Sequence, residues 1–258
     1  MTNGSPGAFK LGDELTIVIP TINSARYIDI ILSFYQDNQI PVTVFVDGRS
    51  EDDTLAVARR FAEAVVISKP VEFAEELIEP MSYLCRTPWM LRLDDDELPS
   101  LAMMEFIREN VRNKGTPVHG FQRHQCVVSC DGRLLSHSAI SPYEHRQWRL
   151  YQPDRVKFSA ELHTPGFEWE GMGGDGAPAE AAMIHLDWVL HTYAERRRKV
   201  ERYETLNAAG QGKPRSYQYY FHEDRARPND CFQELSYPEF ERPCQEISRR
   251  FKELCVAL

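Results

Sequence analysis

Four consecutive acidic residues, Asp94 to Glu97, follow an apolar segment at 89–93 that has the composition of a buried strand. Adjacent carboxylates repel one another, so such a run is costly unless a cation neutralises it. In an extended segment Asp94 and Asp96 point to the same side, where their oxygens are suitable ligands for Mg²⁺ or Mn²⁺. The alternative is a solvated acidic turn before a helix that begins near Ser100.

Polar residues also follow two other strand-like segments. Segment 20–23 comes after the apolar run 15–19, and segment 47–50 comes after the apolar run 42–46. Open parallel sheets bind ligands at the carboxyl ends of their strands. If these strands are neighbours in one sheet, the three polar segments converge on one edge and form a single site that is rich in carboxylates.

The first half of the chain alternates strand-like and helix-like segments. The expected strands are 15–19, 42–46, 64–67 and 89–93, and the expected helices are about 24–35, 50–62, 73–85 and 100–113. Ser50 is expected to cap the second helix, with Asp53 completing a capping box. The alternation and the short connections predict an α/β fold with a Rossmann-like, mostly parallel sheet that is flanked by helices.

Beyond Gly115 the pattern changes to an irregular α+β half. Expected elements are a hairpin of 118–123 and 126–135 that turns at 131–132, short strands at 149–151 and 156–158, a strand-like run at 181–184, a long helix over 187–206 and an amphipathic helix around 247–255. No repeat or linker divides the sequence. We therefore expect one domain over 1–258, with one half at 14–115 and the other at 116–258.

The composition excludes several classes of protein. The 258 residues carry a net charge of −9, which argues against a protein that neutralises nucleic-acid phosphates. No stretch approaches the roughly 20 apolar residues of a membrane span, and residues 1–13 lack the pattern of a signal peptide. The six scattered cysteines suit reduced thiols. We expect a cytoplasmic protein without a transmembrane segment or a nucleic-acid partner.

The segments 15–23, 46–54 and 93–97 together resemble the three N-terminal signatures of family 2 glycosyltransferases, which have the GT-A fold. The third segment is similar to the D-x-D motif of that family. The resemblance covers roughly 15–207, and its motifs occur in the family's order. Segment 142–151, followed by His163, is also similar to the branch that adds sugars to bacterial lipopolysaccharide cores.

The resemblance implies an inverting, metal-dependent transfer of one sugar from a nucleotide-sugar, most often a UDP-sugar, to the hydroxyl of an unknown acceptor. The half at 14–115 then binds the donor and the half at 116–258 binds the acceptor. The implied donor-binding residues are Pro20, Thr21, Asn23, Asp47, Arg49, Ser50, Asp94, Asp95, Arg149 and His163. The implied ligands of Mg²⁺ or Mn²⁺ are Asp94, Asp96 and His185, with His163 as the other histidine that could complete the metal shell.

Two glutamates are candidates for the general base. The family base usually belongs to an acidic pair shortly before an arginine such as Arg149, but this sequence has Glu144 and His145 there. Glu144 is the first candidate and Glu161 the second. The Q-x-x-R-W motif of processive members of the family is absent, which favours the addition of a single sugar.

Three further segments have competing interpretations. The glycine-rich stretch 171–176 is a linker or a lid over the donor. The basic run 195–199 is a solvated helix face, or it contacts phosphates or an anionic membrane surface. Tyr217, Tyr219 and Tyr220 belong to the core or stack on an acceptor. The alternatives to a glycosyltransferase are a nucleotidyltransferase on a similar sheet and a catalytically inactive nucleotide-binding module.

Overall fold

The computed structural model describes residues 12–85, 87–112, 115–137, 146–170, 175–212, 216–224 and 232–256. The strands are β1 (Leu15–Thr21), β2 (Thr43–Asp47), β3 (Ala64–Ser68), β4 (Trp89–Arg92), β5 (Glu97–Pro99), β6 (Val118–Val128), β7 (Leu134–His137), β8 (Gln147–Tyr151), β9 (Lys157–Phe158), β10 (Phe167–Glu168), β11 (Asp175–Gly176), β12 (Ala182–His185) and β13 (Phe232–Glu234). The α-helices are α1 (Ile28–Asp37), α2 (Thr54–Phe61), α3 (Ile78–Leu84), α4 (Leu101–Asn110), α5 (Asp187–Leu190), α6 (Tyr193–Ala208) and α7 (Glu241–Arg250).

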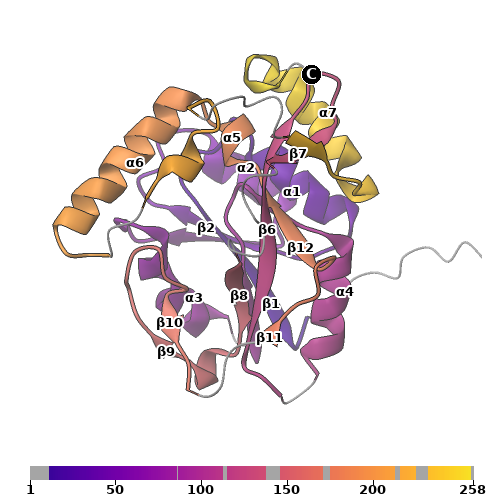
Figure 1. Ribbon diagram of the computed structural model, residues 1–258. Coiled ribbons are helices and arrows are strands. Elements are labelled where there is room, and N and C mark those ends of the chain that lie inside the picture. Colours follow the sequence, from indigo (N-terminus) through magenta and orange to yellow (C-terminus); the bar gives the residue numbers. More distant parts are fainter. Residues whose placement is uncertain are drawn as a thin grey trace, which may run out of the picture.

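An 11-stranded sheet forms the centre of the molecule, in the order β13-β7-β6-β8-β4-β1-β2-β3, with β5, β11 and β12 attached off this path. Figure 1 shows this sheet between α6 on the left and α4 on the right. Strands β3, β2, β1 and β4 are parallel neighbours, and Val18 of β1 pairs with Thr43 on one side and Arg92 on the other. These are the four expected strands, and the expected α/β fold, with parallel central strands flanked by helices, is confirmed.

Beyond β4 the sheet becomes mixed, because β8 and then β6 and β7 join it in antiparallel pairs. The expected turn at 131–132 joins β6 to β7. The expected break between 123 and 126 was wrong, since β6 is one strand of 11 residues. Its polar residues His124 and Gln125 stay in the ladder because they pair with Ile184 and His185 of the parallel strand β12.

Several helix bounds differ from the expectation, and two of the differences lie near the polar strand ends. The long helix expected over 187–206 is two helices, because Thr192 caps α6 through a capping box with Glu195 and ends the helical run of α5. Helix α2 begins at Thr54, with Asp53 as an N-cap residue that makes no side-chain capping bond. Ser50 instead accepts a hydrogen bond from the backbone N–H of Asn23 at 3.2 Å.

Apolar side chains cover both faces of the parallel strands. In β1, Ile17 and Ile19 belong to a large core with α1 and α4, whereas Val18 between them belongs to a second core with Ile78 and Met81 of α3. This alternation follows from the two-residue period of a strand. Burial on both faces explains why β1 reads as an uninterrupted apolar run.

The last helix, α7, returns to the N-terminal half and lies against α1. Arg250 donates to both carboxylate oxygens of Asp29, at 2.8 and 2.6 Å, and the ring of Phe240 packs against Phe34. Among the described residues, no helix combines the length and apolarity needed to cross a membrane. Five of the six cysteines are described, and all five are free thiols.

Candidate functional site

A pocket of about 1240 Å³ opens at the carboxyl ends of the parallel strands. The polar segments after β1, β2 and β4 meet there, as the sequence predicts, with Thr21, Asp47 and Asp94 on its wall. The sequence-predicted residues that line it are Pro20, Thr21, Asp47, Arg49, Asp94, Asp95, Asp96, Arg149, His163 and His185. Eight arginine or lysine side chains and seven carboxylates line this pocket. The whole chain, by contrast, has 30 arginine and lysine residues and 39 aspartate and glutamate residues.

The Asp47 carboxylate is fixed at the end of β2. Arg49 donates to both of its oxygens, from Nε at 3.1 Å and from Nη2 at 2.9 Å, and the backbone N–H groups of Arg49 and Val71 add two more bonds. Burial raises the pKa of Asp47, but these hydrogen bonds outweigh it and leave the pKa below its usual value. Asp47 therefore remains an anion that can only accept hydrogen bonds.

Asp95 faces the end of β1. It accepts hydrogen bonds from Thr21 Oγ1 at 2.5 Å and from the Tyr27 hydroxyl at 3.2 Å. Burial, together with the neighbouring negative charge of Asp96, raises the pKa of Asp95 to about 6. Asp95 thus joins the end of β1 to the acidic run.

Both oxygens of Asp94 are bound by arginines. Arg92 donates to Oδ1 and Arg149 donates to Oδ2, each at 2.6 Å. Burial raises the pKa of Asp94, but Arg149 and Arg92 outweigh it and hold the pKa far below its ordinary value. Arg149 also donates to the buried Glu97 at 2.7 Å, and Arg123 adds a second bond to Glu97 at 3.1 Å. Asp94 therefore links β4 to β8 through an ion-pair network.

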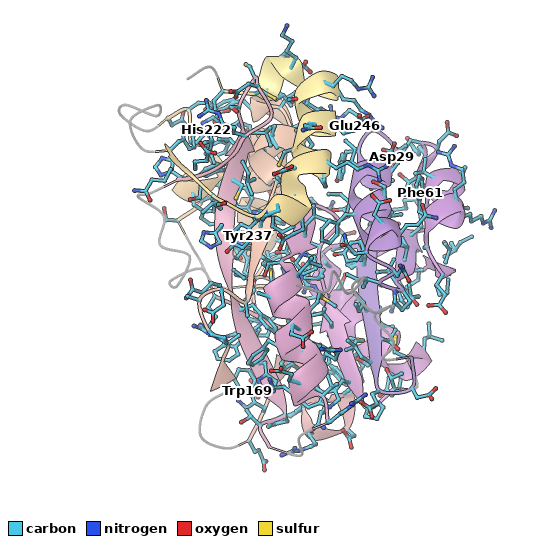
Figure 2. All side chains as sticks on the ribbon, turned by 90° about the vertical axis from the view of Figure 1, so that its right-hand side faces the viewer. Asp29, Phe61, Trp169, His222, Tyr237 and Glu246 are labelled. Atoms are coloured by element: carbon cyan, nitrogen blue, oxygen red, sulfur yellow. The ribbon has the colours of Figure 1, made fainter. Side chains whose placement is uncertain are left out.

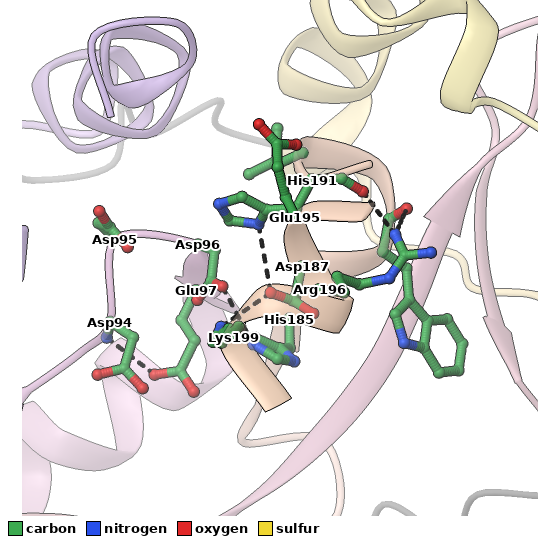
Figure 3. Close-up of polar contacts among 12 residues, drawn as sticks. Asp94, Asp95, Asp96, Glu97, His185, Asp187, His191, Glu195, Arg196 and Lys199 are labelled. Atoms are coloured by element: carbon green, nitrogen blue, oxygen red, sulfur yellow. Dashed lines mark hydrogen bonds and ion pairs between the residues drawn. The ribbon is translucent and has the colours of Figure 1, made fainter. Parts of the chain in front are cut away.

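Asp96 belongs to a different cluster, with Asp187 and His191. One ligand atom from each of these three residues lies within 4.8 Å of the others. Figure 3 shows Asp96, Asp187 and His191 in close-up. Asp96 is 3% exposed and Asp187 is 1% exposed. Asp96 Oδ1 and Asp187 Oδ2 are buried and have no hydrogen-bond partner among the described residues. Such orphaned oxygens are costly in an apolar interior, and a cation would satisfy them.

His185 completes the surroundings of Asp96. Its Nε2 lies 3.3 Å from Asp96 Oδ2, and its Nδ1 is hydrogen-bonded to Gln125 Oε1 at 2.6 Å. His185 thus lies beside Asp96, and His191 lies beside Asp187, with its Nδ1 3.2 Å from Oδ1.

The sequence analysis missed Asp187, His191 and Lys199. The Lys199 ammonium lies 2.9 Å from Asp187 Oδ1, so the basic run contributes to the site and is not only a solvated face. Arg198 and Arg202 of the same helix also line the pocket. The signal that could have found the cluster is the spacing of Asp187 and His191, four residues apart, just after the strand that ends at His185.

His163 lies on another wall of the pocket, at a residue with the left-handed φ of 63°. Its backbone N–H donates to Glu75 Oε1 at 3.1 Å, and its Nε2 is hydrogen-bonded to the Tyr217 hydroxyl. Tyr219 and Tyr220 also line the pocket. Left-handed φ in a residue other than glycine costs free energy, and such strain often marks functional sites.

Three sequence-predicted residues do not line the pocket. Asn23 is exposed and accepts from the Glu51 backbone N–H at 2.8 Å, and Ser50 is bonded to Asn23. Glu161 uses its backbone carbonyl to hold Thr164 in a turn. Glu144 lies outside the described residues, as do 171–174 of the glycine-rich stretch.

Comparisons with protein-family models and with curated proteins gave no match. Among solved structures, residues 1–349 of S. aureus TarS align with 84% of this chain and 73% of that chain, with 13% identity and a TM-score of 0.44. The TarS fragment in complex with UDP-GlcNAc aligns over 43% of this chain and only 35% of its own length, with 17% identity and a TM-score of 0.36. A 4-diphosphocytidyl-2C-methyl-D-erythritol synthase aligns over 54% and 75%, with 13% identity and a TM-score of 0.37. Likenesses this weak assign neither residues nor substrates to this chain.

Proposed function

We propose that this protein is a nucleotide-sugar-dependent glycosyltransferase that uses a divalent cation to move one sugar, with inversion, to an acceptor hydroxyl. The observation that carries the proposal is the group of His191 and the two buried carboxylates of Asp96 and Asp187 at the carboxyl edge of the sheet, beside a pocket with more basic than acidic side chains. Carboxylate and imidazole ligands suit Mn²⁺, and carboxylates also suit Mg²⁺.

The donor set of the cluster fits a divalent cation, and Asp96, Asp187 and His191 are the residues that would hold it. The two orphaned carboxylate oxygens support this assignment. Asp94 is a weaker candidate ligand than the sequence implies, because arginines already bind both of its oxygens. When bound, the cation would neutralise the negative charge that develops on a diphosphate leaving group.

The residues after β1 and β2 suit the nucleoside. The Asp47 carboxylate already accepts four hydrogen bonds, from Arg49 and the Val71 backbone N–H, so ribose hydroxyls or a base N–H can bind it only in place of the half-exposed Arg49 side chain. Arg198 is exposed on the wall of the pocket and has no ion-pair partner among the described residues. Its guanidinium suits the oxygens of a diphosphate.

For the general base, the pocket offers Glu75 in addition to the sequence-predicted Glu144. Glu75 lines the pocket, no described arginine or lysine lies within ion-pair distance of it, and its carboxylate is oriented by the His163 N–H. Burial raises the pKa of Glu75, as a base that accepts a proton from a hydroxyl requires. Glu161 does not line the pocket, which makes it a weaker candidate.

The motifs that resemble family 2 lie at the three strand ends that meet in the pocket, which supports that family assignment. The resemblance to the lipopolysaccharide-core branch stays a prediction, because residues 142–145 of the segment that carries it lie outside the described residues.

The test is donor turnover without an acceptor. Purified protein is incubated with UDP-, GDP-, dTDP- and CMP-sugars with and without Mn²⁺, and free sugar and nucleotide are measured. We expect slow, Mn²⁺-dependent hydrolysis of one donor, which Asp96→Ala abolishes and Thr205→Ala, on the exposed face of α6, leaves unchanged. A chain that binds a nucleotide-sugar but turns over none is an inactive module. Release of diphosphate from a nucleoside triphosphate and a sugar phosphate identifies a nucleotidyltransferase and refutes the proposal.

A further inference from the structure

We propose that the acceptor is itself a carbohydrate, and that one of its pyranose rings packs against the indole rings of Trp148 and Trp169. This inference rests on the proposed function, because it assigns the acceptor end of the same pocket. Trp148 belongs to β8, which lies on the opposite side of β4 from the donor strands β1 and β2, and Trp169 directly follows β10.

The two indoles form an angled wall of the pocket. Trp148 comes from β8 and Trp169 directly follows β10, and both line the cavity. Their ring centroids lie 5.3 Å apart with the planes at 48°. Behind them, the buried Phe167 packs against Trp169, and it belongs to the core beneath α3. The rings are supported from behind but remain partly exposed toward the pocket. Figure 2 shows Trp169 at the end of the molecule opposite to Glu246 of α7.

Gly120 makes room for the position of Trp148. A Cβ atom on Gly120 would lie 2.7 Å from Cε3 and 2.9 Å from Cζ3 of the Trp148 ring, closer than real contacts allow. The β6–β8 ladder also shifts register between His119 and Gly120. Such irregularities re-aim side chains near functional sites. The backbone is therefore adapted to let this indole lie across β6.

The polar groups around the indoles suit hydroxyls. Among the described residues, the indole N–H groups of Trp148 and Trp169 donate to no partner. The indole N–H of the buried Trp188, by contrast, donates to the Tyr219 carbonyl at 3.0 Å. Arg146 and Glu168 stand close to Trp148 and Trp169 in the sequence and also line the pocket. They bring a hydrogen-bond donor and an acceptor to its wall. A tryptophan ring with an apolar face and a polar edge commonly contacts a ligand that also has an apolar face and a polar edge.

A pyranose ring has both an apolar face and a polar edge. Its C–H groups form an apolar face that packs on an indole, and its hydroxyls around the edge need donors and acceptors together. A lipid chain would need a wall without the charges of Arg146 and Glu168, and a polyanion would be repelled by Glu168, which is exposed. The mixture of indoles with both signs of charge therefore favours a sugar.

The experiment is saturation-transfer NMR on the whole chain with UDP and Mg²⁺ present. The probes are methyl glucoside, methyl galactoside, N-acetylglucosamine, lactose and maltotriose, with glycerol phosphate, a serine peptide and dodecanol as acceptors of other classes. We expect at least one sugar to show transfer to the C–H protons of one ring face. Trp169→Ala is expected to weaken its binding by about tenfold or more, since interface tryptophans contribute much of a binding energy.

Matched variants separate the indole wall from general damage to the fold. Trp169→Phe should retain part of the affinity, and Gly120→Ala should weaken it by displacing the Trp148 ring. Tyr83→Ala removes an aromatic ring that is 74% exposed on α3 and does not line the pocket, so it should change nothing. Sugar binding that is unchanged in Trp169→Ala and Gly120→Ala, binding of no sugar in the panel, or selective binding of a non-sugar acceptor would each overturn the inference.

Failure of this inference can be told from failure of the proposed function. Calorimetric binding of UDP, GDP, dTDP and CMP with Mg²⁺ is measured on the same samples. If one of these nucleotides binds and the sugars do not, the acceptor assignment alone is wrong. If sugars bind through the indoles but no nucleotide binds, the carbohydrate subsite stands and the transferase proposal fails.

Discussion

The three neighbouring aspartates of one acidic run have different surroundings and therefore different properties. Asp94 is bound by two arginines, Asp95 by two hydroxyl groups, and Asp96 keeps one orphaned oxygen beside Asp187. Charge alone would make the three residues equivalent. Their hydrogen-bond partners determine that only Asp96 has an unsatisfied, buried ligand atom.

Asp96→Asn is expected to weaken Mn²⁺ binding by about tenfold or more, because an amide oxygen is a poorer ligand for a divalent cation than a carboxylate. Asp95→Asn is the matched control, since Thr21 and Tyr27 already occupy one of its oxygens. Mn²⁺ affinity is measured by electron paramagnetic resonance with UDP present. Equal losses in both variants would contradict the ligand assignment.

Glu75→Gln is expected to reduce kcat by about 10²- to 10⁴-fold, the usual contribution of a general base, with little change in the KM for the donor. Glu161→Gln, outside the pocket, should leave both constants unchanged. Steady-state kinetics of donor turnover in the presence of a sugar acceptor measure the two values. A large loss in Glu144→Gln with normal activity of Glu75→Gln would assign the base to Glu144 instead.

At the scale of elements, the break between α5 and α6 positions the metal-binding candidates. Helix α5 directs Asp187 toward Asp96, and the chain then turns at Thr192 so that α6 brings Lys199 back over the same carboxylate. One continuous helix over 187–206 would lack this turn. The capping box is therefore part of the architecture of the site.

Thr192→Ala is expected to reduce the free energy of unfolding by about 1 kcal/mol, because it removes the side-chain acceptor at the N-terminus of α6. Thr205→Ala in the same helix is the control. Its hydroxyl bonds only to the Glu201 carbonyl on an exposed face, so alanine there should be neutral or slightly stabilising. Urea denaturation of both variants measures the difference, and an equal effect would refute the capping role.

The parallel strands could be predicted from the sequence because burial on both faces leaves uninterrupted apolar runs, such as 15–19. The meeting of their polar ends then follows from topology. The break between α5 and α6 could also be predicted from the sequence, since Thr192 and Glu195 have the spacing of a capping box. By contrast, the Glu75 contact with His163 joins residues 88 positions apart. No local pattern encodes such a contact.

At the scale of the whole molecule, His222 connects the C-terminal segments. Its ring packs against Trp188 of α5 and Phe232 of β13. Burial, with the nearby Arg196 and His137, lowers the pKa of His222 to about 4. The folded protein therefore keeps this imidazole neutral at pH values where the unfolded chain, with an ordinary pKa of about 6.5, takes up a proton.

Stability should consequently fall as the pH decreases from about 6.5 toward 4, because the unfolded state binds the proton first. The difference of about 2.5 between the pKa values of the unfolded and folded states sets an upper limit of about 3.4 kcal/mol for this loss of stability. His222→Gln should be less stable at neutral pH but should flatten the slope in this window. Denaturant titrations at half-unit intervals of pH test this expectation, and an unchanged slope would contradict it.

Lys199 gives the proposed metal site an internal counter-ion, since its ammonium lies 2.9 Å from Asp187. A bare divalent cation near Asp187 would be repelled by this ammonium. A nucleoside diphosphate supplies negative charges that the ammonium can contact instead, and these charges offset the repulsion between the ammonium and the cation. Metal and nucleotide are therefore expected to bind cooperatively, each increasing the affinity of the other by the same factor. Helix α6 would thus couple the two ligands: a divalent cation alone should bind weakly, and a cation together with a nucleoside diphosphate should bind more tightly.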